Sequence, residues 1–138
     1  MENNKEKPFI NYTAEFVKDT PSLLKQFVPK HEKVFGHHST IAFKPDNLDQ
    51  IEIGKEYKLK VIGRVFDDKG DALLVDNNKS NNKYPHITLS CAAGVSPVYS
   101  NELIEKAVAA GTVEYFQNPF EIEVVEGYSS GGKDIVSK

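Results

Sequence analysis

The sequence has little cysteine and no long apolar run, and both absences restrict what the protein can be. Cys91 is the only cysteine among 138 residues, so no disulfide can form within the chain. This favours a reducing, cytoplasmic environment. No apolar run reaches about 18 residues, the minimum for a membrane helix, and no charged-then-apolar segment opens the chain. We therefore expect neither a membrane span nor a secretory signal.

Strong positive charge and a metal-binding pattern are also missing. The net charge of −3 argues against a broad basic face that coats long nucleic acid. A small phosphorylated ligand or an RNA end remains compatible, because it needs only a local site. His31, His37 and His38 lack a matching set of acidic residues, so we expect no metal and no other cofactor.

Local patterns predict a single domain over 1–138, with flexible tails at 1–8 and about 129–138. Two helices are expected: one over 21–28, capped by Asp19 or Thr20, and one over 101–110, capped by Ser100 and closed by Gly111. Alternating polar and apolar residues predict strands at 9–17, 38–43, 57–68, 71–76, 84–92 and 120–128, with 112–117 a further candidate. Mostly hairpin-connected strands and two helices outside the sheet indicate the α+β class.

One short motif occurs twice. "HSTI" at 38–41 and "HITL" at 86–89 both read His, any residue, Thr, apolar. Residues i and i+2 of a strand share a face, so His38 and Thr40 project together, as do His86 and Thr88. The apolar residues on the opposite face of the two strands should point toward a core. These are Ile41, Phe43, Ile87 and Leu89.

Two imidazoles and two hydroxyls in one pocket suit phosphodiester chemistry. One imidazole can accept a proton from an attacking group while the other donates one to the leaving oxygen. Hydroxyls can hold the phosphate oxygens where charge develops. The alternative is that both histidines are buried structural residues, but the repeated motif favours the functional interpretation.

On these motifs the chain resembles the two-histidine (2H) phosphoesterase superfamily, over about residues 9–128. Within it, "PKHEKVFGHHSTIAF" is most similar to the cyclic-phosphodiesterase domain of RNA-repair tRNA ligases and its small stand-alone relatives. The resemblance implies a bilobal α+β fold, with antiparallel sheets around a central groove and two outer helices. It also implies that His38 and His86 are the acid/base pair, in an order left open, and that Thr40 and Thr88 bind phosphate oxygens.

The resemblance implies a metal-independent phosphodiesterase that acts on a nucleotide or RNA-derived phosphodiester, such as a 2′,3′-cyclic phosphate. Some viral members hydrolyse cyclic oligonucleotides that signal bacterial immunity, so a cyclic di- or oligonucleotide is a second substrate class. A non-catalytic module that senses such a nucleotide is the alternative from another class. All four motif residues are intact, which favours an enzyme. The sequence leaves the oligomeric state open.

Four further residues are candidates for substrate binding. By alternation Tyr84 shares a face with His86 and could stack on a base, as could Tyr12, for which core packing is the alternative. Ser90 continues the His86–Thr88 face and could join the phosphate site. Lys83, in the loop before the second motif, could reach a phosphate, although such a loop is usually a solvated turn.

The remaining residues near the motifs are expected to have other roles. His37 precedes His38, so alternation turns it to the opposite face, where it would be packed or hydrogen-bonded behind the strand. Phe35 and Tyr99 flank the motifs and are candidates for the pocket rim. Cys91 falls on the packing face and is expected to be a small core residue.

Overall fold

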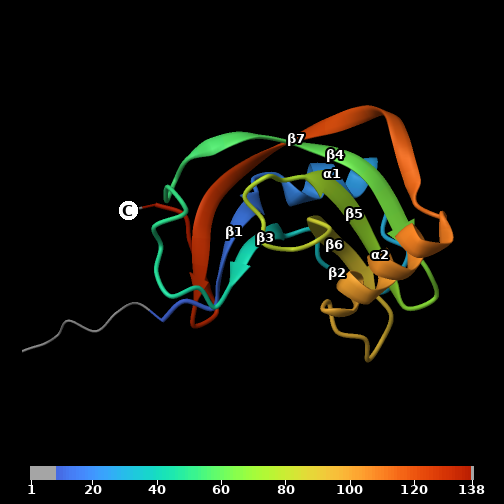
Figure 1. Ribbon diagram of the computed structural model, residues 1–138, viewed down its shortest axis with the longest axis horizontal. Coiled ribbons are helices and arrows are strands. Elements are labelled where there is room, and N and C mark those ends of the chain that lie inside the picture. Colours follow the sequence, from blue (N-terminus) through green and yellow to red (C-terminus); the bar gives the residue numbers. More distant parts are fainter. Residues whose placement is uncertain (1–8, 138) are drawn as a thin grey trace, which may run out of the picture.

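The computed structural model describes residues 9–137, and six of its strands close into a barrel (Figure 1). The ring runs β1-β3-β6-β5-β4-β7, and β7 pairs again with β1. Every pairing is antiparallel, and the short strands β2 and β8 lie outside the ring, on β6 and β7. The elements are β1 (Tyr12–Val17), α1 (Thr20–Gln26), β2 (Lys33–Val34), β3 (His38–Phe43), β4 (Glu56–Phe66), β5 (Gly70–Asp76), β6 (His86–Cys91), α2 (Tyr99–Ala110), β7 (Glu114–Ser130) and β8 (Lys133–Ile135).

The predicted bilobal α+β fold, with sheets around a central groove, is wrong. The chain is instead a mostly β protein, one closed barrel with two helices. The long strand β7 accounts for the difference, because it pairs with β4 at its start and with β1 at its end. In the sequence, Asn118 and Pro119 indicate a turn between two short strands. In the structure they lie in a stretch of β7 that has no partners in β4, so the missing N–H of the proline removes no hydrogen bond between the strands.

An apolar core fills most of the barrel. Alternate residues of β4, β5, β6 and β7 point inward, and α1 and its C-cap residue add Leu23 and Phe27 from one end. α1 begins where predicted, because the Asp19 carboxylate accepts a hydrogen bond from Ser22 N at 3.1 Å. The core consists of Leu23, Phe27, Leu59, Val61, Leu73, Val75, Ile87, Leu89, Ile122 and Val124.

The second helix, α2, packs on the outside of the barrel (Figure 1). Leu103, Ile104 and Ala107 form a second apolar cluster with residues of β4 and β5. Gly111 ends the helix with a φ of 70°, a conformation that glycine adopts without steric cost. Neither helix within residues 9–137 is long and apolar enough to cross a membrane.

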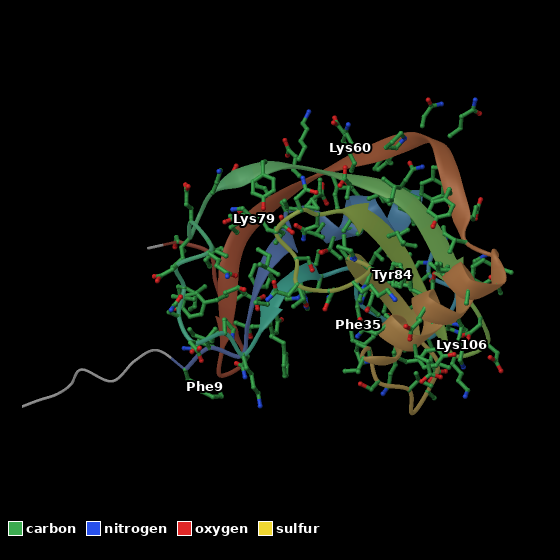
Figure 2. All side chains as sticks on the ribbon, in the orientation of Figure 1. Phe9, Phe35, Lys60, Lys79, Tyr84 and Lys106 are labelled. Atoms are coloured by element: carbon green, nitrogen blue, oxygen red, sulfur yellow. The ribbon has the colours of Figure 1, made fainter. Side chains whose placement is uncertain are left out.

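The barrel interior also contains a polar cluster. The Tyr57 hydroxyl lies within hydrogen-bond distance of a carboxylate oxygen of Glu15 and, at 2.7 Å, of Oε2 of Glu126. Asn77 donates to the other Glu15 oxygen, and Lys79 Nζ lies 2.5 Å from Glu126 Oε2. Figure 2 shows Lys79 beside β7, the strand that carries Glu126. Both carboxylates are therefore buried and fully hydrogen-bonded, as buried acids must be.

The two carboxylates have opposite pKa shifts. Burial raises the pKa of Glu15 to about 7, and the neighbouring Glu126 adds to the rise. Burial also acts to raise the pKa of Glu126, but Lys79 and the hydrogen bonds from Glu52 N and Tyr57 outweigh it, so the pKa lies below its usual value. One proton is therefore held at Glu15 across the mildly acidic range.

The Glu15→Gln variant should reveal this proton in the pH dependence of stability. The folded chain keeps the Glu15 proton up to about pH 7, whereas the unfolded chain releases it near pH 4.5. The stability that Glu15 contributes is thus present below pH 4.5 and lost as the pH rises to 7. Urea unfolding of both proteins should show wild type losing stability relative to the variant across this interval. A difference that does not change with pH would contradict the assignment.

The C-terminal residues form a hairpin where a flexible tail was expected at about 129–138. β7 runs to Ser130, Gly131 and Gly132 turn the chain with positive φ angles, and β8 pairs back onto β7. The sequence "SSGGKDI" resembles a loose tail because its only apolar residue is Ile135. Its strand pairing depends on β7, which local sequence patterns did not predict to extend to Ser130. The predicted flexible segment at 1–8 lies outside the described residues.

Candidate active site

The two His-x-Thr motifs lie on adjacent strands, β3 and β6. These strands are antiparallel, with Ser39 paired to Ile87. This register puts His38 opposite Thr88 and Thr40 opposite His86, and cross-strand neighbours have Cβ atoms about 4.5–5.5 Å apart. All four side chains line one pocket on the outer face of the sheet. The structure therefore brings together the four residues that the motifs singled out.

The pocket has a volume of about 680 Å³. Two asparagines, Asn82 and Asn101, line it together with the imidazole of His37. The apolar part of the wall consists of Tyr12, Phe35, Phe43, Pro97 and Val98. No lysine or arginine is among the described residues that line it. The wall is thus mainly apolar, with a few convergent polar groups, as is usual for small-molecule sites.

Each motif ends in a β-bulge, formed by its fourth residue, which is apolar. Thr13 pairs with Ala42 and Ala14 with Thr40, which leaves Ile41 as an extra residue in β3. Leu89 is the corresponding extra residue in β6, because Asp71 pairs with Ser90 and Ala72 with Thr88. A bulge interrupts the alternation of faces, so predictions made beyond it by alternation fail.

The bulges change the positions of Phe43 and Ser90. Phe43, predicted to face the core, is 72% exposed and lines the pocket beside the motif residues. Ser90, predicted to continue the Thr88 face, is fully buried outside the pocket lining. Its hydroxyl donates to Asp71 Oδ2 at 2.9 Å and accepts from His31 N at 3.1 Å.

His38 is enclosed by other rings. The Tyr12 ring stacks on it, with centroids 4.6 Å apart and an interplanar angle of 20°. Nδ1 of His38 lies 2.8 Å from Nδ1 of His37. Burial lowers the pKa of His38 to about 4, with a smaller lowering by His37 and an opposing contribution from Asp134. The His38 imidazole is therefore neutral at pH 7.

The prediction that His37 faces away from His38 is wrong. His37 precedes the first residue of β3, and its carbonyl accepts a hydrogen bond from Val17 N. Gly36, just before it, turns the chain with a φ of 71°, so the alternation of β3 does not determine the direction of the His37 side chain. Its imidazole lies in the pocket wall, where Nε2 is 2.6 Å from Asp134 Oδ2.

His86 is oriented by its own strand. Its Nδ1 lies 2.8 Å from the carbonyl oxygen of Tyr84. A carbonyl only accepts, so Nδ1 carries a hydrogen, and Nε2 is the nitrogen left for the pocket. Burial lowers the pKa of His86, and the bond to the Tyr84 carbonyl opposes that shift.

Thr88 contacts the first turn of α2. Its Oγ1 lies 2.8 Å from Oγ of Ser100, which is buried. The sequence suggested Ser100 as a helix cap, but α2 begins at Tyr99 and its first backbone groups receive no side-chain cap. The Ser100 hydroxyl holds the Thr88 side chain instead.

Of the four predicted substrate-binding residues, only Tyr12 lines the pocket. Tyr84 packs against the α2 cluster, on the side of the barrel seen in Figure 2, and contacts His86 through its carbonyl oxygen. Lys83 is exposed, with Nζ 3.9 Å from Glu105 Oε2 and 5.4 Å from the Tyr84 ring centroid. The side chains of Tyr84, Lys83 and Ser90 therefore do not line the pocket that the motif residues share.

The two rim candidates are divided in the same way. Phe35 lines the pocket, as predicted. Tyr99 does not, because its hydroxyl donates to Asp67 Oδ2 at 2.5 Å on another part of the surface.

Asn82, Asn101 and Asp134 are site residues that sequence reasoning missed. Asn82 belongs to an Asn- and Lys-rich loop that resembles a solvated turn, and Asn101 lies in the first turn of a helix. Asp134 reaches His37 from 97 residues away, so no local pattern connects them. Across residues 9–137, no group of three or more His, Cys, Asp or Glu side chains is placed to hold a metal ion.

Two His-x-Thr pairs that face one pocket are the pattern by which two-histidine phosphoesterases are recognised. A family model described as the fungal tRNA ligase phosphodiesterase domain matches residues 14–129. The chain belongs to this family, a family of two-histidine phosphoesterases, and the resemblance inferred from the motifs is confirmed. The family as a whole indicates phosphodiesterase activity. A comparison with curated proteins found no match.

Proposed function

We propose that the protein is a metal-independent phosphodiesterase that opens 2′,3′-cyclic phosphates of nucleotides or RNA ends. The observation that carries this proposal is the meeting of His38, Thr40, His86 and Thr88 in one pocket. Membership of a tRNA ligase phosphodiesterase family supports an RNA-derived substrate.

In the proposed reaction, His38 is the general base and His86 the general acid. Neutral His38 takes a proton from a water molecule, whose oxygen attacks phosphorus. The bond from phosphorus to one ribose oxygen breaks, and that oxygen takes the proton from Nε2 of the His86 imidazolium. The products balance as one cyclic diester plus water giving one monoester.

The surroundings of the two histidines support this assignment. Burial keeps His38 unprotonated, because its pKa is about 4. Burial lowers the pKa of His86 as well, and the bond from Nδ1 to the Tyr84 carbonyl, which His86 keeps in both protonation states, opposes that lowering. The hydroxyls of Thr40 and Thr88 would donate to the non-bridging oxygens, where negative charge develops.

The pocket suits a substrate with a single negative charge. A cyclic phosphate diester carries one, and the lining offers hydroxyl and amide donors rather than lysine or arginine. The volume of about 680 Å³ lies within the usual range for ligand sites. Phe35 and Phe43 offer aromatic faces on which a base could stack.

The test is turnover of nucleoside 2′,3′-cyclic phosphates in the presence of EDTA, with the monoester product identified by phosphorus NMR. Cyclic dinucleotides are assayed in parallel. We expect turnover of the 2′,3′-cyclic phosphates without added metal. Turnover of the cyclic dinucleotides alone would overturn the substrate class, and binding without turnover of either would replace the enzyme with a nucleotide-sensing module.

A further inference from the structure

Three side chains, those of Asp134, His37 and His38, form a hydrogen-bonded relay that runs from the C-terminal hairpin into the pocket. Asp134 Oδ2 lies 2.6 Å from Nε2 of His37, and Nδ1 of His37 lies 2.8 Å from Nδ1 of His38. The third residue is the proposed general base, so this inference rests on the proposed function.

The C-terminal hairpin holds Asp134 in a fixed position. Asp134 pairs with Ser129, and Ser129 pairs with Tyr12, so the three lie in one row across β8, β7 and β1. Gly127 lets β8 approach closely, because a Cβ there would clash with the carbonyl oxygen of Ile135. Tyr12 in turn stacks on His38. The carboxylate and the base are thus attached to the same part of the barrel.

Hydrogen-bond chemistry fixes the proton positions in this chain. An ionised carboxylate only accepts, so Nε2 of His37 must carry the hydrogen that bonds to Asp134. A neutral His37 then has a bare Nδ1, which can only accept. The hydrogen between the two Nδ1 atoms therefore belongs to His38, and Nε2 of His38 is left bare.

We propose that Asp134 and His37 are positioning residues that hold His38 in the tautomer whose bare Nε2 can act as the general base. A carboxylate that fixes the tautomer of a catalytic histidine is known in serine proteases, where it contacts the histidine directly. Here a second imidazole lies between the carboxylate and the base.

Three neighbouring groups bear on the protonation of His38, and they come from three directions. His37 precedes β3, Asp134 lies on β8 and His86 lies on β6. The charges of His37 and His86 lower the pKa of His38, and Asp134 raises it. Burial contributes more than any of them. The relay therefore sets the site of the proton, while burial keeps the ring neutral.

Two variants of nearly equal shape separate orientation from packing. In His37→Asn, Oδ1 takes the position of the ring Nδ1 and can still accept from His38. In His37→Leu no acceptor remains. We expect His37→Asn to retain kcat/KM near that of wild type and His37→Leu to lose about 10²-fold, as when a catalytic group is misplaced. Equal losses in both would assign His37 a packing role and overturn the proposal.

The pH profile of kcat/KM gives a signature that packing would not produce. Where His37 is protonated, its charge lowers the pKa of His38, so the loss of that charge in either variant should move the acid limb to higher pH. Asp134→Asn should move the limb to lower pH, because Asp134 raises that pKa. Shifts of the same sign in His37→Leu and Asp134→Asn would overturn the relay.

Nitrogen NMR of the imidazoles tests the relay without any substrate. At pH 7 we expect His38 of the wild-type protein to carry its hydrogen on Nδ1 and to lose this preference in His37→Leu. A wild-type His38 with its hydrogen on Nε2 would overturn the relay whatever the activity. Failure of the proposed function would instead appear as absent turnover with the tautomer unchanged.

Discussion

Replacing His38 or His86 by alanine should lower kcat for a 2′,3′-cyclic phosphate by about 10²–10⁴-fold each, the usual contribution of a general acid or base. Both rings line one pocket, on strands joined by the Ser39–Ile87 pair. Each variant loses one of the two proton transfers. Because both transfers belong to one displacement, the double variant should lose much less than the product of the single losses.

The matched control is Ser90→Ala, two residues after the second motif. Its hydroxyl is bonded to Asp71 and lies outside the pocket. Turnover by Ser90→Ala should stay close to that of wild type, although loss of a buried hydrogen bond costs about 1 kcal/mol of stability. Initial rates with EDTA present give the comparison, and unfolding curves show that each variant is folded. Wild-type turnover by His38→Ala or His86→Ala would refute the assigned roles.

The Arg64→Met variant should lose about 3–5 kcal/mol of unfolding free energy, as expected when a buried carboxylate loses its cation. The Asp71 side chain is fully buried, and Arg64 donates to both of its oxygens at 3.0 Å. Asp71 also accepts hydrogen bonds from Ser90 Oγ and Lys30 N. The pair thus connects β4, β5 and β6 with the connector that precedes β2.

The double variant Arg64→Met/Asp71→Asn separates the unpaired charge from lost packing. The amide that replaces the Asp71 carboxylate is neutral, and its oxygen can still accept from Ser90 and Lys30. Most of the lost stability should therefore return, as measured by urea unfolding. A loss under about 1 kcal/mol in the single variant, typical of an exposed pair, would show that Asp71 is not sealed from water.

Local patterns in the sequence are sufficient to predict most of the strands and the paired motifs. Alternation correctly assigns His38, Thr40, His86 and Thr88 to one face of each strand, since period two depends only on the strand itself. The N-terminal helix is likewise signalled by Asp19 and Pro21. The motifs that indicated the family are local as well, and the family model matches residues 14–129.

Closure of the barrel could not be predicted in this way. It depends on pairing between β1 and β7, which are separated by most of the chain. Residues after the bulges at Ile41 and Leu89 were also misassigned, because an extra residue in a strand is visible only against its partner. Asp134 was missed because its contact with His37 depends on where a distant hairpin packs.

The closed ring also determines how the site can be lost. β3 is hydrogen-bonded to β1 and β6, and β6 is also bonded to β5, so both motif strands have partners on each side. Opening the ladder at either strand breaks the ring and exposes the apolar core inside it. The two histidines therefore belong to one cooperative unit, in contrast to catalytic residues carried by separate lobes. We therefore expect partial unfolding not to separate the two histidines, so that the site is lost only together with the barrel.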